Sequence, residues 1–421
     1  MERIALFNYR CFEHLELALG SKVTLLIGDN ASGKTSLVRA ISACLNSFFS
    51  GFSDENTRFS GLQKSDFREI FAESGLANEL PIEVKFKLLG IESSLQLQTP
   101  KGRTLQLPLR NITQFAHAVY ETLFADAKQV KPLPLIAAFS TSDIHSVRNL
   151  NSARFKRYAQ KPSFGYYECL QGDGFLDYWT LRLLVLREGS TGELEVNGVI
   201  QAIKDMLGAG GCNLIQDVLI RPIQGKVYYQ LVDGRLTDTD NLSDGLRRLV
   251  NICMDLAFRC MLLNKGIHGA EACAKTEGTV LIDEIDLHLH PSLQSVVVKG
   301  LQHAFPGLQF VITSHAPMVM TGIPKDETTK VIHLTYSADN GYVATEISAY
   351  GLDASTIIET VLGVVPRSKD VDVDLKVLFD HIDQDQFEAA KEKLRQMRNQ
   401  FGDSLPDLAR AESMLSFLTA V

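Results

Sequence analysis

The sequence predicts an α/β fold, in which a largely parallel sheet is covered by helices on both faces. The first observation is an apolar run at 23–27, followed by a glycine-containing loop at 28–35 and a helical pattern at 36–45. The second is an alternation of helical and strand-like segments after residue 244, with helices expected at 246–263 and 291–304 and strands at 279–283, 308–312 and 330–334. Such alternation is typical of a parallel sheet with crossover helices.

The N-terminal part is expected to form a β-rich lobe, and an inserted helical region is expected at about 50–240. Alternating apolar residues predict strands at 3–8, 15–19 and 82–89, and 91–109 is expected to hold further strands joined by a turn at Pro100. The remaining expected elements are a helix at 111–129, a strand at 132–139, helices near 175–187 and 197–207, and a hairpin around 218–231.

The chain is predicted to divide into a large unit, 1–365, and a C-terminal helical appendage, 366–421. Apolar residues recur at helical spacing through 375–418, and Pro406 is a favourable first residue for a last helix. We expect three short amphipathic helices that pack either on the core or on a partner chain.

Composition is that of a globular protein without a strong attraction to polyanions. The 421 residues are 45% hydrophobic and 22% charged, with a net charge of −8. No apolar run approaches the ~18 residues of a membrane span, and the N-terminus lacks the pattern of a secretory signal. Seven cysteines without C-x-x-C pairs favour buried thiols over a zinc site or disulfides, so we expect a cytoplasmic location.

The loop at 28–35 matches the phosphate-binding motif G-x-x-x-x-G-K-[ST] in its proper context, between a strand and a helix. Backbone N–H groups of such a loop surround a triphosphate, and the helix N-terminus adds a favourable dipole. Lys34 would reach the β and γ phosphates, and the Thr35 hydroxyl would bind Mg²⁺. The predicted nucleotide-binding residues of this segment are Gly28, Asn30, Ala31, Ser32, Gly33, Lys34, Thr35 and Ser36.

Two adjacent carboxylates end the predicted strand at 279–283. Asp283 is placed to help hold Mg²⁺ beside Thr35, and Glu284 to activate the attacking water as a general base. These two acids and the upstream phosphate loop together predict hydrolysis of a nucleoside triphosphate.

Two further segments resemble elements of ABC-type ATPases. Residues 242–245 read Leu-Ser-Asp-Gly at the start of a predicted helix, which on its own is only a helix cap, and 310–317 form a strand that ends in His315. The resemblance implies that Ser243 and Gly245 bind the γ-phosphate held by the opposite subunit, and that His315 contacts the γ-phosphate and the attacking water. It therefore implies a homodimer with ATP and Mg²⁺ sandwiched between two heads.

Residues 4–12, followed by the phosphate loop, resemble the start of SMC, RecF and OLD-type ATPases, and the whole chain is similar to the PtuA-like ATPases of Septu and retron antiphage systems. This resemblance implies an ABC/SMC-type ATPase head that works with an HNH nuclease, PtuB, as an assembly of dimers. Asp244 and Leu246 depart from the general signature. The glutamine loop has two candidates, Gln63 and the stretch 140–143.

A nuclease site is not expected within this chain. Asp370, Asp372 and Asp374 imitate the acidic pair of the Toprim domain found in OLD proteins, but only about fifty residues follow, and these are predicted to be helical. We interpret the acidic run as a charged loop that caps a helix at 374. The chain also lacks an HNH-like cluster of histidines.

A basic and aromatic stretch at 144–167 could bind nucleic acid, or it could be a solvated loop or a subunit contact, which we favour. Its bases are Arg148, Arg154, Lys156, Arg157 and Lys161, and its aromatic residues are Phe155, Tyr158, Phe164, Tyr166 and Tyr167. His288 and His290 have the spacing of metal ligands but no evident third ligand, so we expect them at the dimer seam.

The hypothesis we favour is a defence ATPase whose nucleotide state regulates a partner nuclease. The alternative is a stand-alone DNA-binding repair ATPase of the RecF/SMC type. The basic stretch at 144–167 is the feature that suggests this alternative. A third possibility is that bound ATP chiefly stabilises the assembly, since saturation at 100 times the dissociation constant contributes about 2.7 kcal/mol per site.

Overall fold

The computed structural model describes residues 1–53, 58–72, 75–124, 131–140, 159, 161–171, 175–189, 192–364 and 367–419. The chain divides into two compact units, Met1–Leu352 and Asp353–Val421. No helix among the described residues combines the length and the apolar character that crossing a bilayer requires.

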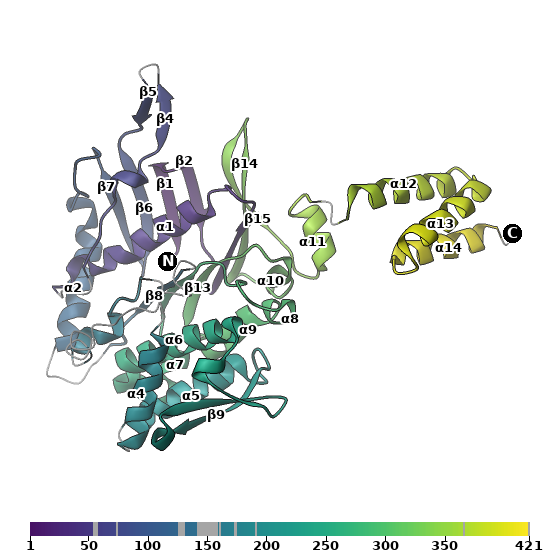
Figure 1. The fold of residues 1–421 in the computed structure, drawn as a ribbon. Coiled ribbons are helices and arrows are strands. Elements are labelled where there is room, and N and C mark those ends of the chain that lie inside the picture. Colours follow the sequence, from purple (N-terminus) through teal and green to yellow (C-terminus); the bar gives the residue numbers. More distant parts are fainter. Residues whose placement is uncertain are drawn as a thin grey trace. The chain divides into compact units, whose positions relative to one another are not determined.

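The core of the first unit is a six-stranded sheet in the order β15-β14-β3-β13-β12-β8, of which Figure 1 labels β8, β13, β14 and β15. Strands β14, β3, β13, β12 and β8 are parallel to one another, and β15 pairs antiparallel with β14 at one edge. The bounds are β3 Val23–Gly28, β8 Leu135–Phe139, β12 Gly278–Ile282, β13 Leu308–Thr313, β14 Thr329–Ser337 and β15 Gly341–Ile347. Every residue of β3 and β13 is buried, as expected for central parallel strands covered on both faces. The predicted α/β class is confirmed.

A second, antiparallel sheet forms the N-terminal lobe in the order β2-β1-β6-β7. Its strands are β1 Arg3–Tyr9, β2 Phe12–Ala18, β6 Ile82–Leu88 and β7 Ile91–Leu97. Helix α1 (Lys34–Asn46) contacts β6 of this sheet and both β3 and β12 of the core sheet. The helix after the phosphate loop is therefore held between two sheets, which fixes the position of its first turn.

Helix α6 (Asp244–His268) is the longest helix described, and most of its residues are buried. It packs against α4 (Leu176–Glu188), α5 (Glu193–Leu207) and strand β8. A small antiparallel sheet follows α5, with strands β9 Ile215–Arg221, β10 Lys226–Leu231 and β11 Leu236–Asp238. The remaining elements of this unit are β4 Glu69–Ala72, β5 Gly75–Asn78, α2 Arg110–Phe124, α7 Ala272–Lys275, α8 Pro291–Gln294, α9 Val297–Ala304 and α10 Pro317–Thr321.

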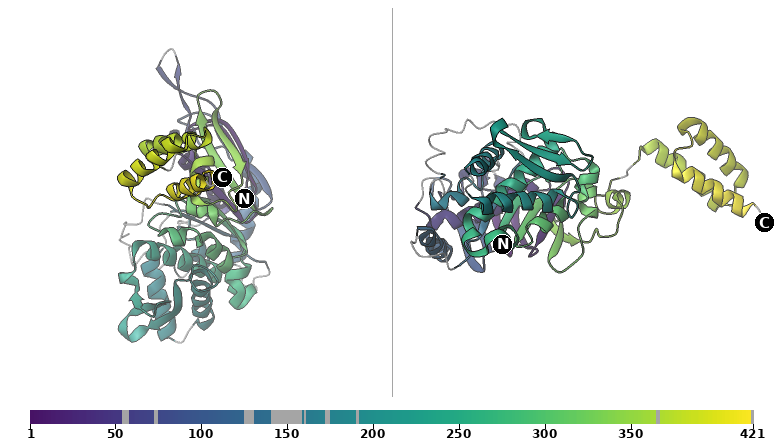
Figure 2. Two further views of the ribbon diagram at one scale, coloured as in Figure 1. Left: turned by 90° about the vertical axis from the view of Figure 1, so that its right-hand side faces the viewer. Right: turned by 90° about the horizontal axis from the view of Figure 1, so that it is seen from below.

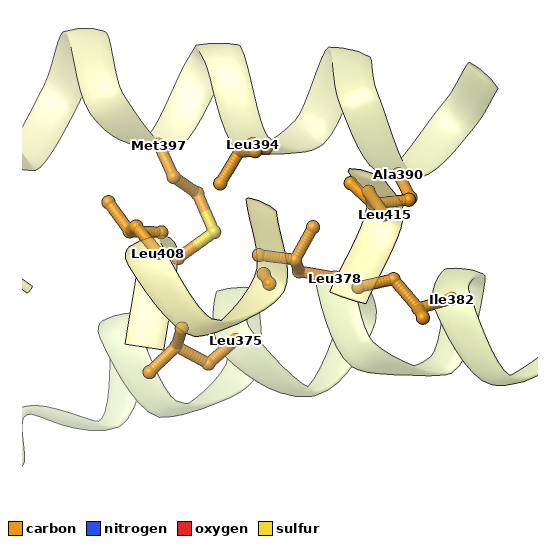
Figure 3. Close-up of a cluster of buried hydrophobic side chains, with 9 residues drawn as sticks. Leu375, Leu378, Ile382, Ala390, Leu394, Met397, Leu408 and Leu415 are labelled. Carbon is orange, nitrogen blue, oxygen red and sulfur yellow. The ribbon is translucent and has the colours of Figure 1, made fainter. Parts of the chain in front are cut away.

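The second unit holds α11 (Ala354–Thr360) and three helices that pack together in both views of Figure 2: α12 Lys369–Asp383, α13 Phe387–Phe401 and α14 Pro406–Leu418. Figure 3 shows that their apolar side chains point toward one another, which confirms the predicted three-helix arrangement. The buried set is Leu375, Leu378, Ile382, Ala390, Leu394, Met397, Leu408, Ala411 and Leu415.

Several predicted elements were wrong in detail. The second strand expected in 91–109 is absent, because Gly102 closes a turn on Thr99 and the segment returns to β7 through a single backbone hydrogen bond, from Leu105 to Gln96. The helix expected at 291–304 is broken between Gln294 and Val297. Three consecutive valines, 296–298, lower helix propensity at that point.

Two further corrections concern the C-terminal part of the chain. Strand β15 was not predicted, and its edge position explains the weak signal, because none of its residues is fully buried. The acidic run at 370–374 is not a loop, since α12 begins at Lys369 and its first turn contains Asp370 and Asp372. Carboxylates in that position suit the positive end of the helix dipole.

Candidate functional site

The phosphate loop follows β3 and leads into α1 in the predicted order of strand, loop and helix. Gly33 has a φ of 92° and precedes the first helical residue, and a Cβ there would lie 2.7 Å from the ring of Phe12. Gly28 has a φ of 150°, and a Cβ there would lie 2.3 Å from the carbonyl oxygen of Leu334 on β14. Only glycine fits both positions.

Lys34 is buried, and its ammonium donates hydrogen bonds to the loop's own carbonyl oxygens, at 2.6 Å to Gly28 and 2.8 Å to Asp29. Burial lowers the pKa of the Lys34 ammonium, whereas the carboxylates of Asp29, Glu284 and Asp283 oppose that shift. Lys34 therefore lies within electrostatic reach of both acids at the end of β12. A triphosphate would offer its ammonium stronger, charged acceptors than backbone carbonyls.

Asp283 and Glu284 follow β12, which is separated from β3 only by β13. The Thr313 hydroxyl at the end of β13 donates to Asp283 Oδ1 at 2.6 Å and accepts from the backbone N–H of Glu284 at 2.7 Å. Glu284 has a φ of 48°, in the left-handed region that is uncommon for residues other than glycine. Thr313 therefore holds both acids in place. Sequence reasoning missed this role because it depends on contact between neighbouring strands.

The phosphate loop follows β3, the paired acids follow β12, and His315 follows β13. Because these strands are parallel neighbours, the three predicted groups lie at one edge of the sheet. Thr35, in the first turn of α1, is exposed, and so is His315, two residues beyond β13. A threonine hydroxyl and an aspartate carboxylate are the hard oxygen donors that Mg²⁺ prefers, so Thr35 and Asp283 fit that ion chemically. Asn30 and Ala31 are exposed loop residues, Ser32 is buried and Ser36 is half-buried.

Ser243 and Gly245 lie at the start of α6, apart from the phosphate loop in the sequence. Ser243 is exposed and stands at the N-cap position, but its side chain makes no capping hydrogen bond. Gly245 is buried, and a Cβ there would lie 2.4 Å from the carbonyl oxygen of His288. Gly245 thus allows α6 to pack directly on the loop that follows the two acids, while the serine hydroxyl is left available.

Arg248 is a second residue that sequence reasoning missed. It is 6% exposed, and its Nη2 donates to the backbone carbonyl oxygen of Asp283 at 2.6 Å. Burial lowers the pKa of this guanidinium, and the carboxylates of Asp286, Glu284 and Asp283 oppose the shift. The doublet Arg247–Arg248 could have been noticed in the sequence, but not which of the two turns inward.

The structure also limits some of the weaker candidates. His290 Nδ1 accepts a hydrogen bond from the backbone N–H of Ser292 and so caps α8, and the described residues contain no group of metal-binding side chains around it or His288. Gln63 is exposed, and its backbone N–H donates to the Asp66 carboxylate in a short capped turn. Residues 141–143, the alternative glutamine-loop stretch, lie outside the described residues.

The basic and aromatic stretch is only partly described. Arg148, Arg154, Lys156, Arg157, Phe155 and Tyr158 lie outside the described residues. Phe164, Tyr166 and Tyr167 are buried, so they are not available to stack on bases. Arg259 of α6 donates to the carbonyl oxygens of Gly165 and Tyr167 and holds this segment against the core.

The phosphate loop, the paired acids and the sheet edge they share define an ATPase. The chain belongs to the family described as "AAA domain, putative AbiEii toxin, Type IV TA system", whose sequence profile matches residues 23–321. The predicted ATPase class is thereby confirmed.

Two relatives match most of the chain, and a third matches a shorter part of it. It is 22% identical to "Retron Vc95 probable ATPase" of Vibrio cholerae, over 80% of this chain and 74% of the relative. It is 24% identical to "Retron Ec83 probable ATPase" of Escherichia coli, over 75% of this chain and 68% of the relative. A shorter match, 34% identical over 24% of this chain and 13% of the relative, is to "Septu protein PtuA" of Bacillus mycoides. The predicted likeness to PtuA-like and retron ATPases is confirmed.

Solved structures with a similar arrangement include the SMC head domain from Thermotoga maritima. It is 14% identical, covers 82% of this chain and 98% of its own, and has a TM-score of 0.40.

Proposed function

We propose that this chain binds and hydrolyses ATP with Mg²⁺ between two copies of itself, and that the resulting dimer regulates a partner HNH nuclease of the PtuB kind in antiphage defence. The observation that carries the first part is the exposed Ser243 hydroxyl, which makes no capping hydrogen bond and belongs to a different element from the phosphate loop and the acids. The phosphate loop and the acids lie at one sheet edge, whereas the uncapped hydroxyl of Ser243 is exposed at the start of α6. A second copy is the natural source of the missing γ-phosphate contact.

In this proposal one protomer supplies the loop residues that hold the triphosphate, and the other supplies Ser243 and Gly245. Thr35 and Asp283 hold Mg²⁺, which neutralises the β and γ phosphates when bound. Glu284 takes a proton from the attacking water, and His315 contacts the γ-phosphate. The loop residues are Gly28, Asn30, Ala31, Ser32, Gly33, Lys34 and Ser36.

The left-handed backbone conformation of Glu284 supports its role as the base. Residues in sparsely populated conformations persist only when their surroundings hold them, and they are frequent at active sites. Here the Thr313 hydroxyl accepts from the Glu284 N–H and so holds the strained residue, while no hydrogen bond is found for the Glu284 carboxylate among the described residues. That carboxylate is free to face a water molecule.

The defence role is supported by the retron and Septu relatives, and a separate nuclease by the fold of the second unit. The regular elements in the described residues of the second unit are all helices, so these residues do not form a Toprim-like sheet. A separate protein would then carry the nuclease, and its activity would follow the nucleotide state of the dimer.

The Glu284→Gln variant tests the ATP-dependent dimer. It should bind ATP but hydrolyse it very slowly, so that closed dimers accumulate and are detected by light scattering after size exclusion. Adding Ser243→Arg to that variant should return it to the unliganded state of association, because the γ-phosphate contact from the neighbouring copy is lost. Hydrolysis by Glu284→Gln at the wild-type rate would refute its role as the base.

The partner is tested by co-expressing this chain with the product of the neighbouring gene, which the proposal expects to be a small HNH protein. We expect the two to co-purify, and phage protection to require both. Cleavage of plasmid DNA by the isolated chain with Mg²⁺ would contradict the proposal. Tight, salt-dependent DNA binding by the isolated chain would instead favour the stand-alone repair ATPase.

A further inference from the structure

Two consecutive arginines on α6 have opposite environments. Arg247 is half-exposed, with Nη2 3.3 Å from Asp177 Oδ1 on α4. Arg248 is buried beneath the loop that carries the two acids, and its Nη2 donates to the Asp283 carbonyl oxygen at 2.6 Å. One arginine of the pair therefore faces the hydrolytic machinery, and its neighbour faces the surface.

The Arg248 guanidinium is only half satisfied. Its Nη1 is buried and has no hydrogen-bond partner among the described residues, and the same holds for Oδ1 of Asp286. Buried polar groups are nearly always paired, so an unpaired donor and an unpaired acceptor that interact electrostatically call for an explanation. Asp286 is also the acid whose charge most favours the protonated form of Arg248.

The backbone ties these residues to the start of α6. Gly245 packs against the carbonyl oxygen of His288, so the first turn of the helix and the loop after β12 are in direct contact. If α6 shifts when Ser243 binds a nucleotide, the loop that carries Asp283, Glu284 and Asp286 would therefore move with it.

We propose that Arg248 is a positioning residue for ATP hydrolysis, which holds the acidic loop through its hydrogen bond to the Asp283 carbonyl. In the ATP-bound dimer, the unpaired Nη1 of Arg248 donates a second hydrogen bond, to the Asp286 carboxylate. This rests on the proposed function, since it assumes that the acids act on ATP. Arg248 touches neither the triphosphate nor the water. It holds the loop that carries Glu284 in position.

The test compares Arg248→Gln with the matched control Arg247→Gln, on the adjacent residue of the same helix. Arg248→Gln should lower kcat on the order of 10- to 100-fold, as loss of a supporting contact to an active site does. KM for ATP should stay within about twofold, because ground-state binding of the nucleotide is untouched. Arg247→Gln should keep the wild-type kcat.

Asp286→Asn identifies the second partner. If Arg248 acts through Asp286, the double variant that combines Arg248→Gln with Asp286→Asn should lose no more activity than Arg248→Gln alone. Arg248→Lys keeps the charge but cannot span both acceptors, so it should recover only part of the lost kcat. It also serves as the informative variant if Arg248→Gln does not fold, as judged by its melting temperature.

Equal kcat for the two glutamine variants would overturn the inference, and so would fully additive losses in the double variant. A parallel rise in KM and fall in kcat would assign Arg248 to nucleotide binding instead. These failures are distinct from failure of the proposed function, which would appear as wild-type hydrolysis that does not depend on Glu284.

Discussion

Thr313 and Asp283 lie at the ends of neighbouring parallel strands, and the threonine hydroxyl donates a 2.6 Å hydrogen bond to the carboxylate. The same oxygen accepts from the Glu284 N–H, so one buried hydroxyl orients the proposed Mg²⁺ ligand and the proposed base together. This bridge joins β13 to β12 at the point where hydrolysis would occur.

Thr313→Val should impair hydrolysis more than ATP binding. The substitution leaves the Glu284 N–H without its partner and the Asp283 carboxylate without a donor, at about 1–3 kcal/mol of folding stability. We expect kcat to fall while KM changes little, as measured by phosphate release. Thr313→Ser, which keeps the hydroxyl, is the control and should retain most of the activity. Wild-type kcat in Thr313→Val would show that the bridge is dispensable.

Lys34→Ala should abolish nucleotide binding, because its ammonium is the only buried positive charge on the phosphate loop among the described residues. ATP at about 100 times its dissociation constant should stabilise the wild-type chain by about 2.7 kcal/mol, visible as a rise in melting temperature. Lys22→Ala, at the opposite end of β3, should keep that rise. An ATP-induced shift of normal size in Lys34→Ala would refute the assignment.

Leu378→Ala should loosen the three-helix core of the second unit. Leu378 is fully buried in that core, and such truncations cost about 2–5 kcal/mol. Hydrogen exchange on the full chain should show lost protection in α12, α13 and α14. Val373→Ala, at a side chain that is 58% exposed on the same helix, should change stability by under about 0.5 kcal/mol. Unchanged protection in Leu378→Ala would mean that the observed core does not hold these helices together.

Local sequence patterns predicted the parts of the candidate site that are contiguous in the chain. The loop that ends in Lys34 and Thr35 lies within one strand–loop–helix unit, and Asp283 and Glu284 end a single strand. Thr313 and Arg248 escaped prediction because their roles arise from contacts 29 to 35 residues away in the sequence. Spacing within one element carries no information about such contacts.

The limits of local sequence patterns also explain which elements of the fold were predicted wrongly. Central strands such as β3 can be predicted because they are apolar runs. The edge strand β15 has no fully buried face, so its sequence lacks that signal. Residues 370–374 look like a charged loop because acids are common in loops, but they are equally favourable in the first turn of a helix. Composition alone did not separate the two.

The central claim, that each protomer completes the other's ATP site, is tested most directly by mixing two inactive variants. Lys34→Ala lacks the phosphate contact but keeps Ser243, and Ser243→Arg has the converse defect. In a mixed dimer one of the two sites combines an intact phosphate loop with an intact serine. An equimolar mixture should therefore recover about one quarter of the wild-type ATPase activity, given random pairing into twofold dimers. No recovery, with mixed dimers shown to form, would place the whole site within one chain and contradict the account.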